Sequence, residues 1–155
     1  MRNVIVVDTS VVIKWILEEA DSAKAKALLT EWIDKETSIL APALLAYEVA
    51  NVLYQKVRKG EIVLEVAKET LTEILLSELD INFLHDPVLS LRAVELAHKY
   101  GLQASYDVHY LALAEHEGCE LWTSDTRMWR AIGGKIAWLR RLEDYHASPE
   151  DHETT

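Results

Sequence analysis

The fold is set by residues 3–10, which run Asn-Val-Ile-Val-Val-Asp-Thr-Ser. Residues 4–7 are all β-branched and apolar, and a short continuous run of this kind predicts a strand buried on both faces of a sheet. Asp8 ends the run, and Thr9 and Ser10 are favourable N-caps for a short helix that would follow through Leu17. The chain is therefore expected to begin with a buried strand that leads directly into a helix.

The same alternation continues along the rest of the chain. Pro42 suits a first helical turn, the pair Asp86-Pro87 suits another, and Ser105 is expected to cap a third helix. Helices are predicted over residues 21–34, 42–59, 61–79, 86–100, 105–118 and 125–132, and strands over residues 38–41, 80–85, 120–124 and 135–139. Alternating strands and helices predict the α/β class, here one domain with a mostly parallel central sheet and helices on both faces.

Length and composition limit the possible classes of protein. The chain has 155 residues, of which 50% are hydrophobic and 27% charged, which is typical of one globular domain and excludes a disordered chain. We expect the domain to span residues 1–145 and an acidic, flexible tail to span residues 146–155. No apolar run approaches the roughly 18 residues of a membrane span. The apolar start is too short for a signal peptide, and Cys119 is the only cysteine, so a cytoplasmic location is expected.

The net charge of the chain excludes one class of nucleic-acid-binding protein. The formal charge is −10, which argues against a protein that coats nucleic acid non-specifically, because such proteins are normally basic. A nucleic-acid enzyme whose metal ions neutralise the contact surface remains possible.

Four acidic residues are distinguished by their positions. Asp8 and Asp125 each follow a predicted strand, so both are expected at the carboxyl edge of the sheet, where ligands bind in such folds. Glu48 and Asp107 lie on predicted helices. On a helical wheel Glu48 falls between Leu44 and Val52, and Asp107 shares the face of Leu111 and Ala114, so both are expected to face inward.

Converging carboxylates favour a metal site. Buried carboxylates without a partner are costly, and four at one edge would raise one another's pKa. A divalent cation removes this cost, and all-oxygen ligands select hard ions such as Mg²⁺ or Mn²⁺. Each acid alone is more often a helix cap or part of a surface ion pair, but the joint pattern of two strand-end acids and two inward-facing helix acids favours a metal.

Four segments resemble, in order, the motifs of PIN-domain ribonucleases. Residues 6–10 resemble the opening motif, residues 41–53 the segment with the second acid, residues 105–114 the third, and residues 121–125 the closing Thr-x-Asp element. The resemblance covers about Val4 to Leu139. Single-domain members of this length are typically VapC-type toxins of toxin–antitoxin pairs.

The resemblance implies an Mg²⁺- or Mn²⁺-dependent endoribonuclease that cleaves RNA phosphodiesters. It implies that Asp8, Glu48, Asp107 and Asp125 are the catalytic and metal-binding residues. The hydroxyls of Thr9, Ser10 and Thr123 would support these acids. It also implies a homodimer that is held inactive by a small antitoxin protein.

Other residues and functions stay open. Lys14, Arg127 and Arg130 lie near the strand ends and could meet RNA phosphates, and Trp15 and Trp129 could stack on bases or on an antitoxin. One alternative function is a non-catalytic PIN-like interaction module. Another is a phosphatase of the haloacid-dehalogenase type, which would need a second Asp where Ser10 stands.

Overall fold

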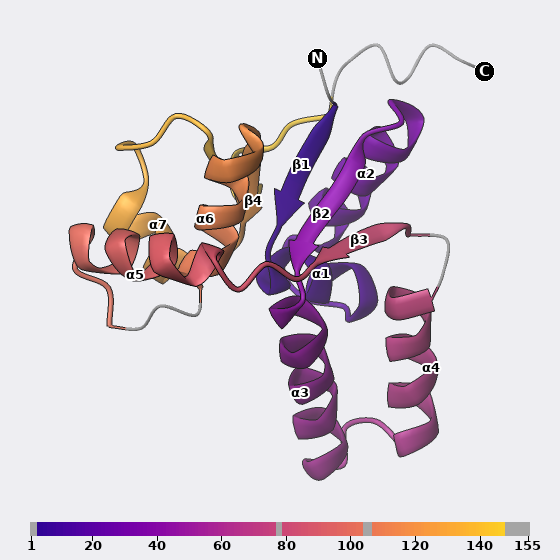
Figure 1. Cartoon of the computed structure of the whole chain (residues 1–155). Helices are drawn as coiled ribbons and strands as arrows, with labels where there is room; N and C mark the ends of the chain where they lie inside the picture. The colour runs from indigo at the N-terminus through magenta and orange to yellow at the C-terminus, as the bar shows by residue number, and fades with distance from the viewer. Residues whose placement is uncertain (1–2, 77–78, 104–106, 148–155) are drawn as a thin grey trace.

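The computed structural model describes residues 3–76, 79–103 and 107–147. Within these residues seven α-helices accompany a five-stranded sheet that is parallel throughout, with strand order β3-β2-β1-β4-β5, which confirms the α/β prediction (Figure 1). The strands are β1 (Val4–Val7), β2 (Ser38–Pro42), β3 (Ile81–Leu84), β4 (Glu120–Thr123) and β5 (Leu139–Arg141). The helices are α1 (Thr9–Ile16), α2 (Ser22–Asp34), α3 (Leu44–Arg58), α4 (Leu64–Leu76), α5 (Leu89–Lys99), α6 (Val108–Glu117) and α7 (Thr126–Ile132).

Strand β1 is the centre of the sheet. Val6 pairs with Leu40 of β2 on one side and with Leu121 of β4 on the other. The chain first moves outward from β1 to β3 and then returns through α5 and α6 to β4. By the rule that connections between parallel strands are right-handed, α1 and α2 are expected on one face and α5 to α7 on the other. The strand order reverses between β1 and β4, and the crevice beyond such a reversal is where α/β sheets bind ligands.

Helices α3 and α4 form a hairpin that extends away from the sheet (Figure 1). Its inner residues Leu53, Ala67 and Ile74 are buried. No helix in the described residues is long and apolar enough to cross a membrane.

Four aromatic side chains form a continuous row in the core, which we call the aromatic row: Trp15, Trp32, Trp122 and Tyr145. Neighbouring rings meet edge to face, with centroids 6.1 to 6.2 Å apart, an arrangement that aromatic pairs prefer. Trp15 is buried and donates its indole N–H to the carbonyl of Ala25 at 2.9 Å. The expectation that Trp15 stacks on a base is therefore wrong.

Two predicted element boundaries are wrong because pairing with a neighbouring strand decides them. Pro42 does not open a helix but ends β2, because β3 pairs that far and sets Pro42 beside Leu84. The last strand does not span residues 135–139, since Lys135 and Leu139 donate their N–H groups to local turns. It begins at Leu139, where β4 supplies a partner in Leu121.

Other ends differ by a few residues. Helix α5 starts at Leu89 rather than at residue 86, because the Asp86 carboxylate accepts a hydrogen bond from the N–H of Val88 and closes a turn. Helix α4 lies inside the predicted range 61–79. Ser105, expected as a cap, and residues 148–155 of the expected tail lie outside the described residues.

Candidate active site

All four predicted acids line one pocket of about 380 Å³ at the carboxyl edge of the sheet. Asp8 follows β1, and Asp125 lies just beyond the neighbouring strand β4. Glu48 enters the pocket from α3, and Asp107 enters it from the residue before α6. Residues that are far apart in the sequence thus meet where the strand order reverses.

Asp8 is the buried member of the set, with 5% of its surface exposed. Its carboxylate caps α1 by accepting from the N–H of Val11, so Asp8 is the N-cap and the expectation of Thr9 or Ser10 in that role is wrong. Burial raises the pKa of Asp8 from 3.8 to about 7. Hydrogen bonds from Ser10, Thr123 and Val11 oppose this rise in pKa, and the charge of Asp125 adds to it.

Two hydroxyl side chains tie the ends of β1 and β4 together. Ser10 donates to Asp8 at 2.5 Å and accepts from the N–H of Ser124 at 2.8 Å. Thr123, which is fully buried, donates to the other oxygen of Asp8 at 2.5 Å and accepts from the N–H of Asp125 at 2.9 Å. Asp8 and Asp125 are therefore held in a fixed relation by one hydroxyl between them.

Asp125 also begins a helix. Its Oδ1 accepts the N–H of Arg127 at 2.8 Å and caps α7. A carboxylate at a helix N-terminus is favoured by the helix dipole. The structural explanation of Asp125 as a cap is therefore correct, and it is compatible with a place in the pocket.

Glu48 is half-buried and is held by two hydroxyls from other elements. Tyr110 of α6 donates to Glu48 Oε1 at 2.5 Å. The Thr9 hydroxyl lies 3.2 Å from the same oxygen and 2.9 Å from the Tyr110 hydroxyl. Burial raises the pKa of Glu48, and the charges of Asp107 and Asp125 add to the rise.

Tyr110 was not singled out from the sequence. It lies three residues after Asp107, a spacing that puts two side chains on one side of a helix, and this was the available signal. Its side chain is buried, and burial followed by the hydrogen bond to Glu48 raises the pKa of the phenol. The phenol therefore keeps its proton and acts as a donor.

Asp107 differs from its expected placement. It precedes the first turn of α6 rather than lying in it, is largely exposed, and makes no side-chain capping bond. Partial desolvation raises the pKa of Asp107, the charge of Asp125 adds to this, and Arg127 opposes it. Asp107 and Asp125 therefore lie close enough for their charges to interact, as two ligands of one cation would.

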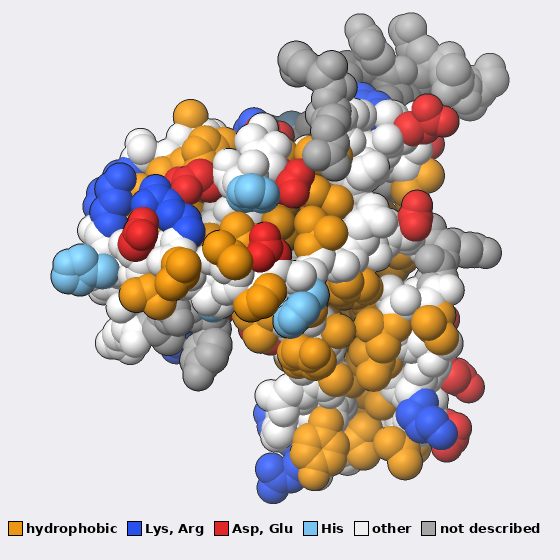
Figure 2. Space-filling model, in the orientation of Figure 1, with side chains coloured by type: hydrophobic (Ala, Val, Ile, Leu, Met, Phe, Trp, Pro, Cys, Tyr) orange, Lys and Arg blue, Asp and Glu red, His pale blue; other side chains and the backbone are white. Residues whose placement is uncertain are grey.

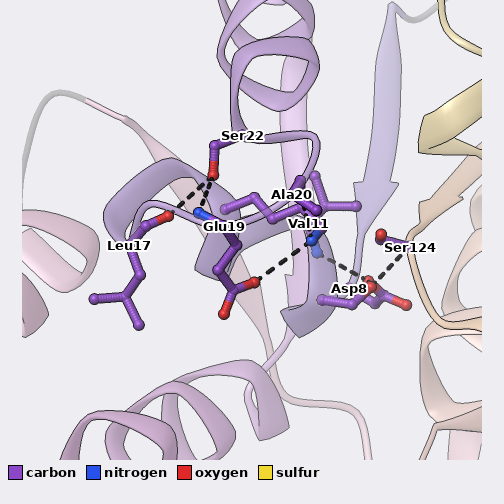
Figure 3. Close-up of polar contacts among 9 residues, drawn as sticks. Asp8, Val11, Leu17, Glu19, Ala20, Ser22 and Ser124 are labelled. Atoms are coloured by element: carbon purple, nitrogen blue, oxygen red, sulfur yellow. Dashed lines mark hydrogen bonds and ion pairs between the residues drawn. The ribbon is translucent and has the colours of Figure 1, made fainter. Parts of the chain in front are cut away.

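Lys14 lines the pocket together with Glu19, its ion-pair partner. Its ammonium donates to the carbonyl of Ala20 at 2.8 Å and pairs with Glu19 at 3.4 Å. Ser22 holds the loop by accepting from the N–H of Glu19 and donating to the carbonyl of Leu17 (Figure 3). The side chain of Lys14 is only 12% exposed, so a braced loop fixes this cation at the pocket.

Of the two arginines expected near the strand ends, Arg127 lies there, and its charge opposes the rise in the pKa of Asp107. Arg127 lines an adjoining pocket of about 570 Å³ that shares Asp107 with the first. Arg130 is exposed on α7 and lines neither of these two pockets.

The donor set fits a hard divalent cation. All four acids supply oxygen, and three of them (Asp8, Glu48 and Asp107) have raised pKa values that a nearby cation would reverse. Across the described ranges no group of three or more His, Cys, Asp or Glu is arranged to hold an ion as it stands. Mg²⁺ usually keeps several waters and is bound through one or two carboxylates, so a hydrated ion suits this arrangement.

Comparisons with known proteins agree on one fold. The sequence model of the PIN domain matches residues 5–135. The structure of PAE2754 from Pyrobaculum aerophilum is 24% identical and aligns over 92% of this chain and 93% of that chain, with a TM-score of 0.66. No curated protein sequence matches the chain significantly.

Two further structures, one of a toxin and one of a protein–DNA complex, are also similar. VapC20 from Mycobacterium tuberculosis, described as a sarcin-ricin loop cleaving toxin, is 18% identical over 88% of this chain and 98% of that chain, with a TM-score of 0.61. VapBC2 from Rickettsia felis, bound to a DNA fragment from its promoter, is 15% identical over 89% and 96%, also with a TM-score of 0.61. At these identities the likeness concerns the fold.

Proposed function

The chain belongs to the PIN domain family, and from this premise we propose that it is an Mg²⁺- or Mn²⁺-dependent endoribonuclease that acts as the toxin of a toxin–antitoxin pair. One observation carries the proposal. Asp8, Glu48, Asp107 and Asp125, from four separate segments of the chain, line a single pocket where the strand order of the sheet reverses. Such a cluster of charge is costly to fold and is explained by the ion that it would bind.

The four acids would hold the metal. A divalent ion held there would supply Lewis acidity towards a phosphodiester and would lower the pKa of a bound water. Ser10 and Thr123 keep Asp8 fixed through both of its oxygens. Asp125 has only one oxygen engaged by the backbone of α7, so its other oxygen is available to orient the attacking water.

Lys14 is the residue that we assign to the substrate. A pocket lined by acids repels a phosphodiester unless a cation faces it. The Lys14 ammonium is fixed at the pocket by the loop that carries Glu19 and Ala20. It would position one phosphate without reading a base, as lysine contacts to nucleic acid normally do.

The partners would be RNA, a small antitoxin and a second copy of the chain, all in the cytoplasm. The toxin–antitoxin complexes among the similar structures support the antitoxin. Apolar side chains gather on the surface of the α3–α4 hairpin (Figure 2), and exposed patches of this kind mark interaction sites. The exposed residues there include Tyr47, Tyr54, Val63, Leu64 and Leu76.

Two other functions fit less well. A non-catalytic interaction module would have no use for four acids around one pocket. A phosphatase of the haloacid-dehalogenase type needs a second Asp, and Ser10, which occupies that position, is instead engaged with Asp8 and Ser124.

The test is cleavage of RNA in Mn²⁺ and in EDTA, beside release of phosphate from a phosphomonoester. We expect Mn²⁺-dependent RNA cleavage and no phosphate release. Asp107→Asn should lower the cleavage rate at least about 100-fold, because it removes a ligand charge, and should leave the melting temperature in EDTA unchanged or slightly raised.

Asp34→Asn is the matched control, because Asp34 is exposed at the end of α2, away from the pocket. It should cleave like the wild type. Inertness of the wild-type protein towards RNA in Mn²⁺ would contradict the proposal. Asp107→Asn protein that melts several degrees lower in EDTA would make Asp107 structural.

A further inference from the structure

We propose that Tyr110 is a positioning residue that fixes Glu48 as a one-oxygen ligand of the divalent ion. This inference rests on the proposed function, because it assumes that the pocket binds a metal. It goes further by assigning a role to a tyrosine that does not itself carry a ligand charge.

The geometry joins three elements at one oxygen atom. Tyr110 of α6 places its hydroxyl 2.5 Å from Glu48 Oε1 on α3, and Thr9 of α1 approaches the same oxygen to 3.2 Å. The Tyr110 and Thr9 hydroxyls are themselves 2.9 Å apart. A hydrogen bond to a carboxylate is about twice as strong as one between neutral groups, so the orientation of Glu48 is set by contacts from outside α3.

The two carboxylate oxygens of Glu48 have different surroundings. Tyr110 and Thr9 both address Oε1, and Oε2 receives no hydrogen bond from residues 3–76, 79–103 or 107–147. Glu48 lines the acid pocket. With Oε1 engaged, Oε2 is the atom left to meet a ligand, and a glutamate so restrained loses less rotational freedom when it binds an ion.

The restraint on Glu48 affects metal binding because few side chains of the site are already arranged to hold an ion. No three acidic, His or Cys side chains of the described chain are arranged to hold an ion as they stand. An ion held by one or two carboxylates and several waters depends strongly on the orientation of each carboxylate. Tyr110 would therefore influence metal affinity although the ion does not touch it.

The ring and the hydroxyl of Tyr110 have separable roles. The ring is 1% exposed and packs in the core, so it contributes to stability whatever the site does. Replacement by phenylalanine keeps the ring and removes only the oxygen. Tyr110→Phe therefore tests positioning without opening a cavity.

The experiment measures Mn²⁺ affinity by isothermal titration calorimetry. RNA cleavage is measured in parallel at several Mn²⁺ concentrations. We expect Tyr110→Phe to bind Mn²⁺ about 10- to 100-fold more weakly, the range for groups that orient metal ligands. High Mn²⁺ should restore most of kcat, and KM for RNA should stay unchanged. Thr9→Val should weaken Mn²⁺ binding less, since its hydroxyl is the more distant partner, and it supplies the test if Tyr110→Phe does not fold.

The control is Tyr100→Phe, which removes a phenolic hydroxyl beside Lys99 and away from the pocket. It should bind Mn²⁺ like the wild type. Tyr110→Phe that binds Mn²⁺ with wild-type affinity would overturn the inference while leaving the proposed function intact. Wild-type protein that binds no Mn²⁺ would overturn the proposed function, and this inference with it.

Discussion

Trp122 and Thr123 are adjacent on β4, but their side chains enter two regions that are stabilised differently. Trp122 enters the aromatic row, where it lies between Trp32 and Tyr145. Thr123 points to the acidic edge and donates to Asp8. Both side chains are buried, at 6% and 0% exposure, so the difference between the regions is one of chemistry and not of depth.

The two regions divide stability and function between them. The aromatic row removes large apolar surfaces from water, which favours folding. The acidic edge opposes folding at neutral pH, because Asp8 is buried there and burial raises the pKa of its carboxyl. Variants of the row should therefore act on stability, and variants of the edge should act on metal and RNA.

The largest effect is expected from breaking the row. Trp32→Ala removes the ring that joins Trp15 to Trp122, and it should lower the free energy of unfolding by about 3–5 kcal/mol, as measured by urea denaturation. Below its reduced melting temperature the variant should still cleave RNA in Mn²⁺. Trp138→Ala, at a half-buried position outside the row, should lose less stability. Equal losses of stability for the two variants would contradict the larger stabilising contribution expected of the aromatic row.

The next effect concerns the edge without metal. Because the pKa of Asp8 is raised to about 7 in the folded protein, the folded state holds this proton between pH 3.8 and about 7 while the unfolded state releases it. Stability due to Asp8 is therefore complete below pH 3.8 and is lost as the pH rises through 7, by at most about 4 kcal/mol.

Asp8→Asn isolates this contribution. We expect the free energy of unfolding of the variant, relative to the wild type, to increase between pH 4.5 and pH 7.5 when both are measured by urea denaturation in EDTA. Excess Mg²⁺ should reduce the difference, since binding to the wild-type folded state adds stability. A difference in the free energy of unfolding that does not change with pH would show that folding does not raise the pKa of Asp8.

The smallest effect is expected at Lys14. Lys14→Met keeps the buried stem and removes the charge, and it should raise KM for RNA about 3- to 10-fold with little change in kcat. The dependence of log KM on log salt should become shallower by about one, as for loss of one phosphate contact. Lys26→Met, which removes an exposed ion pair with Glu18, is the control and should leave both values unchanged. An unchanged salt dependence for Lys14→Met would limit Lys14 to bracing the loop.

Local patterns were sufficient for the parts of this molecule that depend on neighbours in sequence. The apolar run of β1 and its end at Asp8 predicted both the strand and the edge at which Asp8 lies. Helical periodicity predicted that Glu48 faces inward, and the structure places it in the pocket. These inferences needed only the periods of a strand and a helix.

Features that depend on distant partners were missed. The contact between Tyr110 and Glu48 joins residues 62 positions apart, and no local pattern distinguishes a tyrosine that meets a carboxylate from one that only fills the core. The end of β2 at Pro42 and the start of β5 at Leu139 were also misjudged. Both are decided by the reach of the neighbouring strand rather than by the residues themselves.

The central place of β1 has a consequence for synthesis on the ribosome. Strand β1 pairs with β4, which is translated only after residue 119, so one edge of β1 has no partner in the sheet while the segments between these two strands are being made. An unpaired apolar edge invites association with other chains. The same delay means that Asp125 can join Asp8 only after the segments between them have been translated, and a chain terminated before β4 carries an incomplete acid pocket.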